Sequence, residues 1–496
     1  LLLKNKDGRQ QMLTENGEEE ITDNTIVEFR FKKDAKEYWQ WVPIRVRYDK
    51  TSDYKKGGRN YGNAYHVAQS VWRSINLPIT DEIITTGIGI IENNLDDDVY
   101  YNRKSKETFT KSLRDFHNRY VKSKLITSVA NRGNTLMDMS VGKAGDIQKW
   151  LNANLSFVFG IDYSKDNIEN KMDGACARYI KTKRKRRNMF DALFIHGDSS
   201  ENIKRTDAAK SDKGKMVINA LSGVGSKDKK MLGEGVYKKW GIAKNGFNII
   251  SNQFSIHYFF KDNKTLNGFI RNCSEYCAVG GYMIGTCYNG KKIFNSLKDK
   301  AINENIFLME QEKKIWSITK LYKNEEMPDT TDCLGYTIDV YQESINKSFK
   351  EYLVNFDYFK MIMENYGFAV LTVEEANELG LPNSLGSFED LFINMSEEYK
   401  SKRLDKKQIG ESLSMSQNEK EISFYNNYFV FKKIRNVNTK NVYNIEIAKT
   451  DTGQLDEMKK SRETIKKIMA ERISKKVNKK FNKKIKLPNM GEESKE

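Results

Sequence analysis

The stretch from Thr135 to Asp162 reads TLMDMSVGKAGDIQKWLNANLSFVFGID. It contains a short apolar run, a turn of small residues, a helix-forming segment and a second apolar run that ends on an acid. Strand, turn, helix and strand in this order are typical of the start of a nucleotide-binding α/β sheet. Small residues in the turn let the backbone approach a ligand, and the following helix presents unpaired N–H groups to it.

The turn also indicates which ligand fits. Asp162, at the end of the second run, suits the two hydroxyls of a ribose. A dinucleotide turn needs three glycines, and only Gly142 and Gly145 are present; a P-loop needs Ser or Thr after Lys143, where Ala144 stands. S-adenosylmethionine (SAM), which has a ribose but no phosphate, fits better than either. From this segment alone, an ordinary α/β crossover without a ligand stays an alternative.

Composition narrows the class of protein. The chain has 496 residues, 38% hydrophobic and 30% charged, which is enough for two to four domains. No apolar run approaches the roughly 20 residues of a membrane span, so we expect a soluble intracellular protein. Five cysteines without a C-x-x-C pair and four histidines predict no metal site and a reduced compartment. The net charge of +17 suggests a polyanionic partner, although a solubility effect is the alternative.

Residues 1–104 are predicted to be β-rich, with strands at 26–31 and 41–51, a helix at 64–75 and an acidic linker at 88–104. Alternation along the second strand places Arg45, Arg47 and Asp49 on one face, next to Lys50. Two arginines and a lysine together suit phosphates, and a solvated edge strand is the alternative.

Further along, strands are predicted at 190–198, 247–254 and 279–286, with a polar insertion at 204–245. Helices at 346–367 and 374–396 flank a strand at 368–373, and 400–422 is expected to be polar and mobile. The basic run 181–187 is either an RNA-phosphate contact or a solvated loop. Residues 459–486 have an apolar residue about every fourth position and predict a basic amphipathic helix, for docking or packing first and RNA contact second.

Six short patterns occur in order between residues 112 and 435. They are D-x-x-x-G-K-x-G-D-x-x-K-W at Asp138–Trp150, R-Y at Arg178–Tyr179, F-x-A-x-F-I-x-x-D-S at Phe190–Ser199, S-x-Q-F-x-x-H-Y at Ser251–Tyr258, G-G-Y-x-I-G-T at Gly280–Thr286 and E-Y-L-V at Glu351–Val354. Together they resemble the mRNA cap guanine N-7 methyltransferases. Ser140, Val141 and Ala144 replace the family's glycine, cysteine and glycine, and we expect SAM binding to survive these exchanges.

The N-terminal part carries a second resemblance. W-x-x-x-R-x-R-x-D-K, from Trp41 to Lys50, is similar to the last motif of the mRNA capping guanylyltransferases, in their C-terminal OB-fold. The segment 62–87 resembles the sequence after that motif in the multifunctional capping enzymes of large DNA viruses. The K-x-D-G nucleophile is absent, because Asn5 stands at its position. The resemblance implies the end of a guanylyltransferase whose body lies upstream, with Arg45, Arg47, Asp49 and Lys50 as phosphate-orienting residues.

The methyltransferase resemblance implies roles for particular residues. The cofactor side is Lys122, Ser140, Gly142, Asp162, Asp198, Gln253 and Tyr258. The cap side is Asn118, Lys143, Lys149, Arg178, His257, Glu351 and Tyr425, with Tyr428 as the alternative to Tyr425. Guanine N-7 carries a free lone pair, so no general base is implied, and His257, Tyr258 and Glu351 act by positioning. For Glu351 taken alone, a helix-capping acid stays the alternative, and for His257 taken alone, a residue without a functional role.

We therefore predict an α/β, Rossmann-like class I SAM-dependent methyltransferase with an OB-fold remnant before it and a basic helical tail after it. The predicted domains are 1–104, 105–450 and 451–496. The expected activity is methyl transfer from SAM to N-7 of the terminal guanine of capped RNA. The alternatives are a methyltransferase acting on another target and a non-catalytic RNA-binding subunit. The expected partner is 5′-capped RNA, with a stimulatory protein subunit as a candidate, in the host cytoplasm or the virion if the source is viral.

Overall fold

The computed structural model describes residues 3–6, 8–36, 40–58, 61–76, 108–186, 188–343, 345 and 347–452. The chain divides into two compact units, Leu1–Asn93 and Asn94–Glu496. The predicted linker at 88–104 and the predicted helix at 459–486 lie outside the described residues. Within the described ranges, no helix is both long and apolar enough to cross a membrane.

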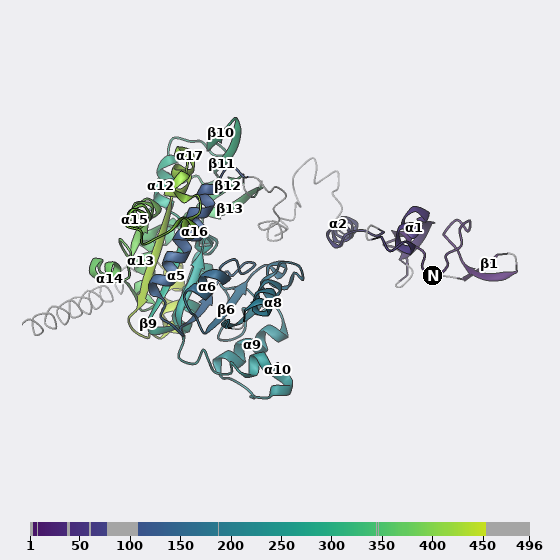
Figure 1. Cartoon of the computed structure of the whole chain (residues 1–496), viewed down its shortest axis with the longest axis horizontal. Helices are drawn as coiled ribbons and strands as arrows, with labels where there is room; N and C mark the ends of the chain where they lie inside the picture. Colours follow the sequence, from purple (N-terminus) through teal and green to yellow (C-terminus); the bar gives the residue numbers. More distant parts are fainter. Residues whose placement is uncertain are drawn as a thin grey trace, which may run out of the picture. The chain divides into compact units, whose positions relative to one another are not determined.

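The N-terminal unit is β-rich, as predicted. Its described elements are β1 (Leu3–Lys6), β2 (Arg9–Met12), β3 (Val27–Phe31), β4 (Trp41–Val46), α1 (Tyr48–Lys55) and α2 (Tyr65–Asn76). Strand β1 pairs with β2 and β3 pairs with β4, both antiparallel (Figure 1). The backbone N–H of Val46 donates to Glu19, which lies between the two pairs in the sequence.

The strand predicted at 41–51 is too long. Strand β4 ends at Val46, and Asp49 and Lys50 lie on α1 instead. Asp49 sits in the first turn of that helix, where an acid favours the helical state. The two arginines do share a side, because both guanidinium groups contact Glu28, at 2.8 Å and 3.4 Å. A role for this cluster in phosphate binding stays a prediction.

The second unit is built on an eight-stranded sheet in the order β14-β16-β9-β8-β5-β6-β7, with β15 beside β16 (Figure 1). The strands are β5 (Thr135–Asp138), β6 (Phe157–Asp162), β7 (Asp191–His196), β8 (Phe247–Gln253), β9 (Cys277–Tyr288), β14 (Phe368–Val370), β15 (Leu385–Ser387) and β16 (Asn426–Lys433). Strands β5 to β9 are parallel, and β16 is antiparallel to β9. The predictions of strands near 135–139, 157–161, 190–198, 247–254, 279–286 and 368–373 are confirmed.

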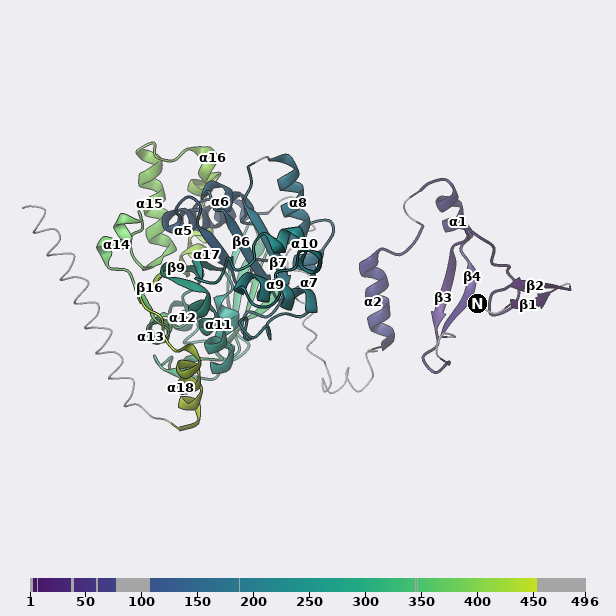
Figure 2. The same cartoon turned by 90° about the horizontal axis from the view of Figure 1, so that it is seen from below.

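Helices cover both faces of this sheet because successive strand residues point to opposite sides. Leu136 and Val158 pack on one layer, and Met137 and Phe159 on the other. The first layer includes α5 (Lys122–Val129), α6 (Ile147–Asn152), α8 (Ala175–Lys185) and α15 (Phe388–Lys400). The second includes α9 (Asp212–Ser222), α10 (Lys229–Tyr237), α11 (Asn263–Tyr276) and α13 (Phe356–Asn365). Figure 2 shows α5, α6 and α15 across the sheet from α11 and α13.

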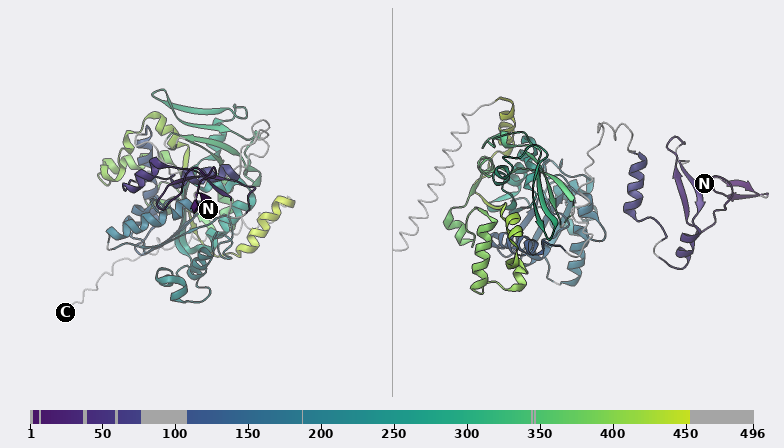
Figure 3. Two further views of the ribbon diagram at one scale, coloured as in Figure 1. Left: turned by 90° about the vertical axis from the view of Figure 1, so that its right-hand side faces the viewer. Right: turned by 90° about the horizontal axis from the view of Figure 1, so that it is seen from above.

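A second, four-stranded antiparallel sheet was not predicted. It runs β10 (Asn305–Glu310), β11 (Lys313–Lys320), β12 (Thr337–Gln342) and β13 (Lys347–Tyr352), next to α12 (Gly290–Ser296) and α17 (Gln417–Phe424) (Figures 1 and 3). The helix predicted at 346–367 is therefore wrong over residues 347–355. Alternation over 347–352 makes that segment a strand, and α13 begins only at Phe356.

Three further expectations need correction. The polar segment 204–245 contains α9 and α10, whose Val217, Leu221 and Val236 enter the core, so it is part of the fold rather than an insertion. The segment 400–422 carries α16 (Lys406–Ile409) and most of α17, with Ile409 buried. The described part of the basic run 181–187 is mainly the end of helix α8 rather than a loop.

Gly285→Ala is expected to destabilise the protein by about 3 kcal/mol, since overpacking of this kind costs about 1–3 kcal/mol and sometimes more. Gly285 lies in β9, between Asn252 of β8 and Phe429 of β16. A Cβ there overlaps the Asn252 carbonyl oxygen and the Phe429 ring. Gly235→Ala in α10, where nothing lies within 4 Å, is the matched control and should be neutral or slightly stabilising. Urea unfolding measures both; equal stability of the two variants would contradict this packing.

Candidate functional site

The sheet changes direction between β5 and β8. From β5 the chain builds outward to β6 and β7, and it then returns to place β8 and β9 on the other side of β5. Ligands of such sheets bind in the crevice at the carboxyl ends of the strands, at this switch point. The predicted residues Ser140 and Gly142 follow β5, Asp162 ends β6, and Gln253 ends β8. The topology therefore gathers these residues at one edge of the sheet.

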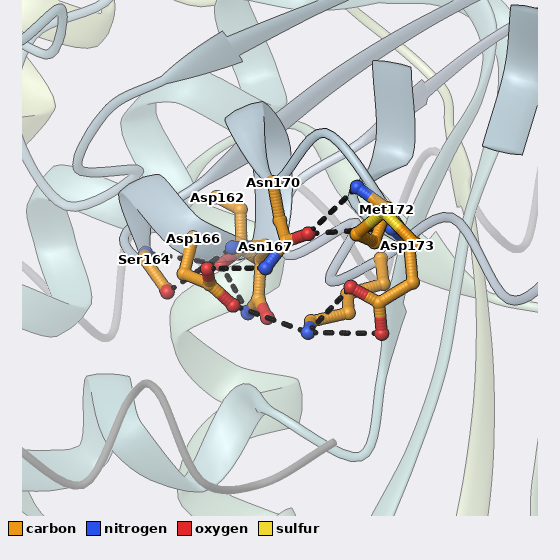
Figure 4. A network of polar contacts seen from close by, with 8 residues as sticks. Asp162, Ser164, Asp166, Asn167, Asn170, Met172 and Asp173 are labelled. Carbon is orange, nitrogen blue, oxygen red and sulfur yellow. Dashed lines mark hydrogen bonds and ion pairs between the residues drawn. The ribbon is translucent and has the colours of Figure 1, made fainter. Parts of the chain in front are cut away.

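Asp162 is the centre of a hydrogen-bond network. Its Oδ2 accepts from the Gly142 N–H at 2.6 Å, and its Oδ1 accepts from the Ser164 N–H at 3.0 Å and the Asn167 side chain at 2.9 Å. Figure 4 shows these contacts next to the hydrogen bond between Asp166 and Asn170. Burial raises the pKa of Asp162, and the three donors oppose that rise. The carboxylate is thus fixed beside the turn that follows β5, with Oδ2 still able to accept another hydrogen bond.

Lys143 has protein partners of its own. Its Nζ lies 3.1 Å from carboxylate oxygens of both Asp166 and Asp173, and its side chain is 1% exposed. The ammonium group therefore ties the turn after β5 to the residues after β6. In this arrangement the ammonium group is paired with two carboxylates rather than presented to the cap, which is the role that the family resemblance implied.

A cluster of charges flanks the same turn. Asp146 accepts from Lys122 at 3.4 Å and lies 2.8 Å from Lys149. Burial opposes ionisation of Asp146, but the two lysines outweigh it and hold its pKa at about 2. Asp138, at the end of β5, has its pKa raised to about 7 by burial and then by Asp146. The crevice thus offers both a lysine ammonium and carboxyl groups, which together match an amino acid zwitterion.

Hydrogen bonds connect the neighbouring strand ends to this turn. The Asn252 side-chain amide donates to Ser140 Oγ at 3.4 Å, and Ser199 Oγ donates to the Met139 carbonyl at 2.6 Å. Asp198, beside Ser199, accepts from the Ser200 backbone and hydroxyl groups. Gln253 accepts from Thr286 Oγ1 at 3.2 Å. The predicted cofactor residues Ser140, Asp198 and Gln253 are therefore held on connected segments.

Phe254 is a site residue that the sequence reasoning did not single out. Its φ of +56° is unusual for a bulky side chain, and strain of this kind is concentrated at functional sites. Its N–H donates to the Thr286 carbonyl at 2.9 Å, and its ring stacks on His117 at 5.3 Å. The Lys122 ammonium lies 5.6 Å from the ring centre. The sequence signal for Phe254 is its place in the pattern S-x-Q-F-x-x-H-Y. Asp138 and Asp146 were also not assigned a role, although both lie in the pattern Asp138–Trp150.

His257 and Glu351 form a second cluster of predicted site residues. His257 lies in the short helix η3 (Ile256–Lys261) after β8, and Glu351 lies on β13. His257 Nε2 is 3.8 Å from Glu351 Oε2, and both side chains are buried. Burial lowers the pKa of His257 to about 3; burial, and then Asp339, raises that of Glu351 to about 8. Near pH 7 both groups are mainly neutral, so the contact is not an ion pair.

The other predicted site residues have few contacts with His257 and Glu351. Tyr258 is 41% exposed and its ring lies 4.2 Å from that of His257. Asn118 follows His117 in the chain, and its side-chain amide donates to the Arg114 carbonyl. Tyr425 stacks on Trp316 of β11 at 5.4 Å. Arg178 lies on α8, and its guanidinium group forms no hydrogen bond or ion pair with a predicted site residue in the described part of the chain.

Glu351→Gln is expected to remove a pH dependence of folding stability between about pH 4.5 and pH 8. The folded protein keeps the proton up to a pKa of about 8, whereas the ordinary value is 4.5, so the unfolded chain releases it first. This contribution to stability is complete below pH 4.5 and is lost as the pH rises toward 8, by at most ~1.4 kcal/mol per pH unit.

Urea unfolding at several pH values measures this effect. The exposed Glu325 provides the matched control, because Glu325→Gln should leave the pH profile of the parent unchanged. Parallel profiles for the parent and Glu351→Gln would show that the buried carboxyl does not titrate abnormally.

Three features define a Rossmann-like, SAM-dependent methyltransferase. The order of the parallel strands reverses at β5, Asp162 holds the turn at Gly142 and suits a ribose, and the charges near Asp146 match an amino acid zwitterion. A family model described as "mRNA (guanine-N(7))-methyltransferase domain" matches residues 92–434, and the chain belongs to this family. A second model, "mRNA capping enzyme, C-terminal domain", matches residues 2–85. SAM is therefore the cofactor of the larger unit.

Similar proteins agree with this assignment. The "Probable mRNA-capping enzyme" of Acanthamoeba polyphaga mimivirus is 30% identical over 70% of this chain and 30% of its own length. The mRNA-capping enzyme of African swine fever virus (isolate Pig/Kenya/KEN-50/1950) is 21% identical over 71% of this chain and 36% of its own. The chain thus spans about a third of these viral relatives. The mRNA cap guanine-N(7) methyltransferase of Schizosaccharomyces pombe is 26% identical over 53% of this chain and 61% of its own length.

Among solved structures, the CcbJ methyltransferase from Streptomyces caelestis is similar with a TM-score of 0.36 and 10% identity, over 68% of this chain and 100% of that one.

The residues of the crevice fit SAM. Three buried polar atoms near the end of β8 have no hydrogen-bond partner among the described residues: Asn252 Oδ1, Ser255 Oγ and His257 Nε2. Buried polar atoms are ordinarily paired, so unpaired ones clustered at a switch point indicate that a polar ligand completes them. SAM carries the amino and hydroxyl groups that such atoms can bond.

Proposed function

We propose that this chain transfers a methyl group from SAM to N-7 of the terminal guanine of GpppN-capped RNA. The observation that carries the proposal is the position of Glu351 and His257. His257 lies in η3, the short helix after the end of β8, where the SAM crevice is expected. Glu351 lies beside it, in a buried setting that suits the hydrogen-bonding edge of a purine. Family membership supports the same activity.

On the donor side, the chain's residues bind and orient the cofactor, which supplies an electrophilic methyl group when bound. Asp162 accepts from the ribose hydroxyls through its remaining lone pairs. Lys122 attracts the methionine carboxylate, and Asp138 attracts the amino group, which favours ionisation of this carboxyl. Asp198, Gln253, Ser140 and Gly142 line the rest of the crevice, with Tyr258 at its exposed margin.

On the acceptor side, Glu351 accepts from the guanine N–H groups as a carboxylate, and His257 lies beside it. Because the pKa of Glu351 is raised to about 8, guanine binding has to displace a proton at neutral pH. Asn118, Lys149, Arg178 and Tyr425 are the proposed contacts to the rest of the cap. Lys143 is left out, since Asp166 and Asp173 already hold it.

The reaction needs alignment rather than acid–base catalysis by the protein. Guanine N-7 has an available lone pair, so the chain's task is to hold the purine and the methyl donor in line and to exclude water. Orientation of this kind supplies roughly 7–11 kcal/mol in favourable cases. His257 supports this role, since a pKa lowered to about 3 keeps it neutral in the physiological range.

Methyl transfer from labelled SAM to GpppA-RNA and to pppA-RNA of the same sequence tests the proposal. We expect label only on the capped RNA, released as 7-methylguanine after cleavage. Equal label on both RNAs would indicate another RNA target. Absence of label, with SAM binding retained, would indicate a non-catalytic subunit. Either result would refute the proposal.

The finer assignments of partner and location belong to the same proposal. Capped RNA is the substrate, a stimulatory protein subunit is a candidate partner, and the similarity to viral capping enzymes favours the host cytoplasm or the virion. The segment 2–85 is the proposed end of a guanylyltransferase. Arg45 and Arg47, with Asp49 and Lys50, are its proposed phosphate-orienting residues.

A further inference from the structure

The basic end of α8 and the lysines around α10 lie on one surface. Asp191 is the first residue of the edge strand β7. Its carboxylate forms ion pairs with the ammonium groups of Lys183 of α8, at 2.7 Å, and of Lys239, at 2.8 Å. Lys238 also interacts electrostatically with Asp191 and Lys183. Figures 1 and 2 show α8, α9 and α10 on the same flank of the sheet. Two segments from opposite helical layers therefore meet around the β7 edge.

This region, which we call the β7-edge surface, is strongly positive. It comprises the basic residues of 181–186 and 227–244 together with Asp191. It contains eleven lysines and arginines (Lys181, Lys183, Arg184, Lys185, Arg186, Lys227, Lys229, Lys230, Lys238, Lys239 and Lys244) against three acids (Asp191, Asp228 and Glu234). All of the basic side chains except Lys239 are exposed. A net charge of +8 on one edge attracts a polyanion.

Aromatic rings lie among these charges. The Lys227 ammonium is 5.3 Å from the Tyr237 ring centre and 5.7 Å from that of Trp240, and the Lys244 ammonium lies 5.4 Å from the Trp240 ring centre. Both rings are partly exposed. Lysines next to exposed ring surface are what single-stranded nucleic acid binding surfaces combine, with phosphates held by charge and bases by stacking. This composition favours RNA over an acidic protein.

Helix α8 connects this surface to the proposed cap site. Helix α8 connects β6 to the parallel strand β7, so its last turn lies near the first residue of β7, where Lys183 pairs with Asp191. Arg178, a proposed cap contact, is three residues before Lys181 and seven before Lys185, which places the three on one side of the helix. We infer that the β7-edge surface binds the RNA chain that follows the cap, through its phosphates and without regard to sequence. That the RNA runs from the cap site to this surface rests on the proposed function. That the surface binds RNA does not depend on it.

Charge reversal tests this inference directly. The variant Arg184→Glu/Lys185→Glu changes two basic residues in the last turn of α8. The matched control, Lys400→Glu/Lys407→Glu, changes two exposed basic residues in the last turns of α15 and α16, with the same change in net charge. Circular dichroism melting checks that both variants fold. The probe is a fluorescent uncapped single-stranded RNA of about 20 nucleotides, long enough to cover such a surface.

We expect the α8 variant to bind this RNA at least about tenfold more weakly at 50 mM salt, and the slope of log K against log salt to fall by about 1.4, or 0.7 for each lost phosphate contact. The control should stay within about twofold of the parent. Equal losses in the two variants would show that only net charge matters and would overturn the inference. So would an unchanged α8 variant, or binding of polyglutamate by the parent as tight as that of RNA.

A kinetic experiment separates this inference from the proposed function. In methyl transfer, the α8 variant should raise KM for long capped RNA and leave kcat and the KM for the GpppA dinucleotide unchanged. If no methyl transfer occurs with any substrate, the proposed function fails, and the RNA-binding result still decides the role of the surface. Raised KM values for the dinucleotide as well would place Arg184 and Lys185 in the cap site and refute a separate surface.

Discussion

Glu351→Gln is expected to lower kcat/KM for capped RNA by about 100-fold or more, because a glutamine cannot accept from both guanine N–H groups as a carboxylate does. Its amide NH₂ instead faces one of the donors. Because Glu351 lies on β13 and contacts His257 rather than the turn after β5, we expect the Kd for SAM to change by less than about twofold. Steady-state methyl transfer and calorimetric titration with SAM measure the two effects.

The pH dependence of cap binding gives a second readout for this variant. In the parent, affinity for GpppA should increase up to about pH 8 and then level off, since binding needs the ionised carboxyl group. Glu351→Gln should show no such rise. His257, Asp339 and Cys287 are titratable groups near this carboxyl. The low pKa of His257 keeps it neutral throughout this range, and burial raises the pKa of the Cys287 thiol. A normal affinity for the cap in Glu351→Gln would remove Glu351 from the site.

Asp162→Ala is expected to weaken SAM binding by about 100-fold or more, since each hydrogen bond to a charged acceptor contributes about 1.5–3 kcal/mol and the ribose offers two. The same substitution frees the Gly142 and Ser164 N–H groups, so we also expect lower stability. Asp162→Asn preserves the shape and separates the two effects. It should keep most of the stability and still lose much of the affinity.

Isothermal titration with SAM measures this prediction, with Asp212→Asn as the control. Asp212 begins α9 and its side chain is 98% exposed, so that substitution should leave SAM binding unchanged. Retained SAM affinity in Asp162→Ala would mean that the cofactor does not bind at the end of β6. Loss of GpppA binding in Asp162→Asn would mean that the substitution acts on the whole fold.

The start of the sheet was predictable because its signals are local. Thr135–Asp138 and Phe157–Asp162 are short apolar runs separated by a small-residue turn and a helix, and the structure has β5, α6 and β6 there. The second sheet was missed for the opposite reason. Alternation in 305–352 is compatible with a strand, but it does not say which strand is the partner. E-Y-L-V lies within the helix predicted at 346–367.

The candidate site divides in the same way. Asp162, Ser140 and Gly142 follow from their positions after particular strands, because parallel strands bring their carboxyl ends to one edge. The structure gave Lys143 different partners from those expected, since Asp166 and Asp173 approach it only after α7 (Lys165–Glu169) has folded back. Phe254 could be recognised only from the structure, by its positive φ and by its contact with His117.

The amino-acid sequence by itself determined the period of each segment, the residue types at the strand ends and the family to which they belong. The tertiary structure decided which of these residues meet, and therefore how strongly each is buried. Glu351 illustrates the difference: its carboxyl group is an ordinary acid in the sequence. Its pKa rises to about 8 only because β13 packs beside η3 and removes it from water.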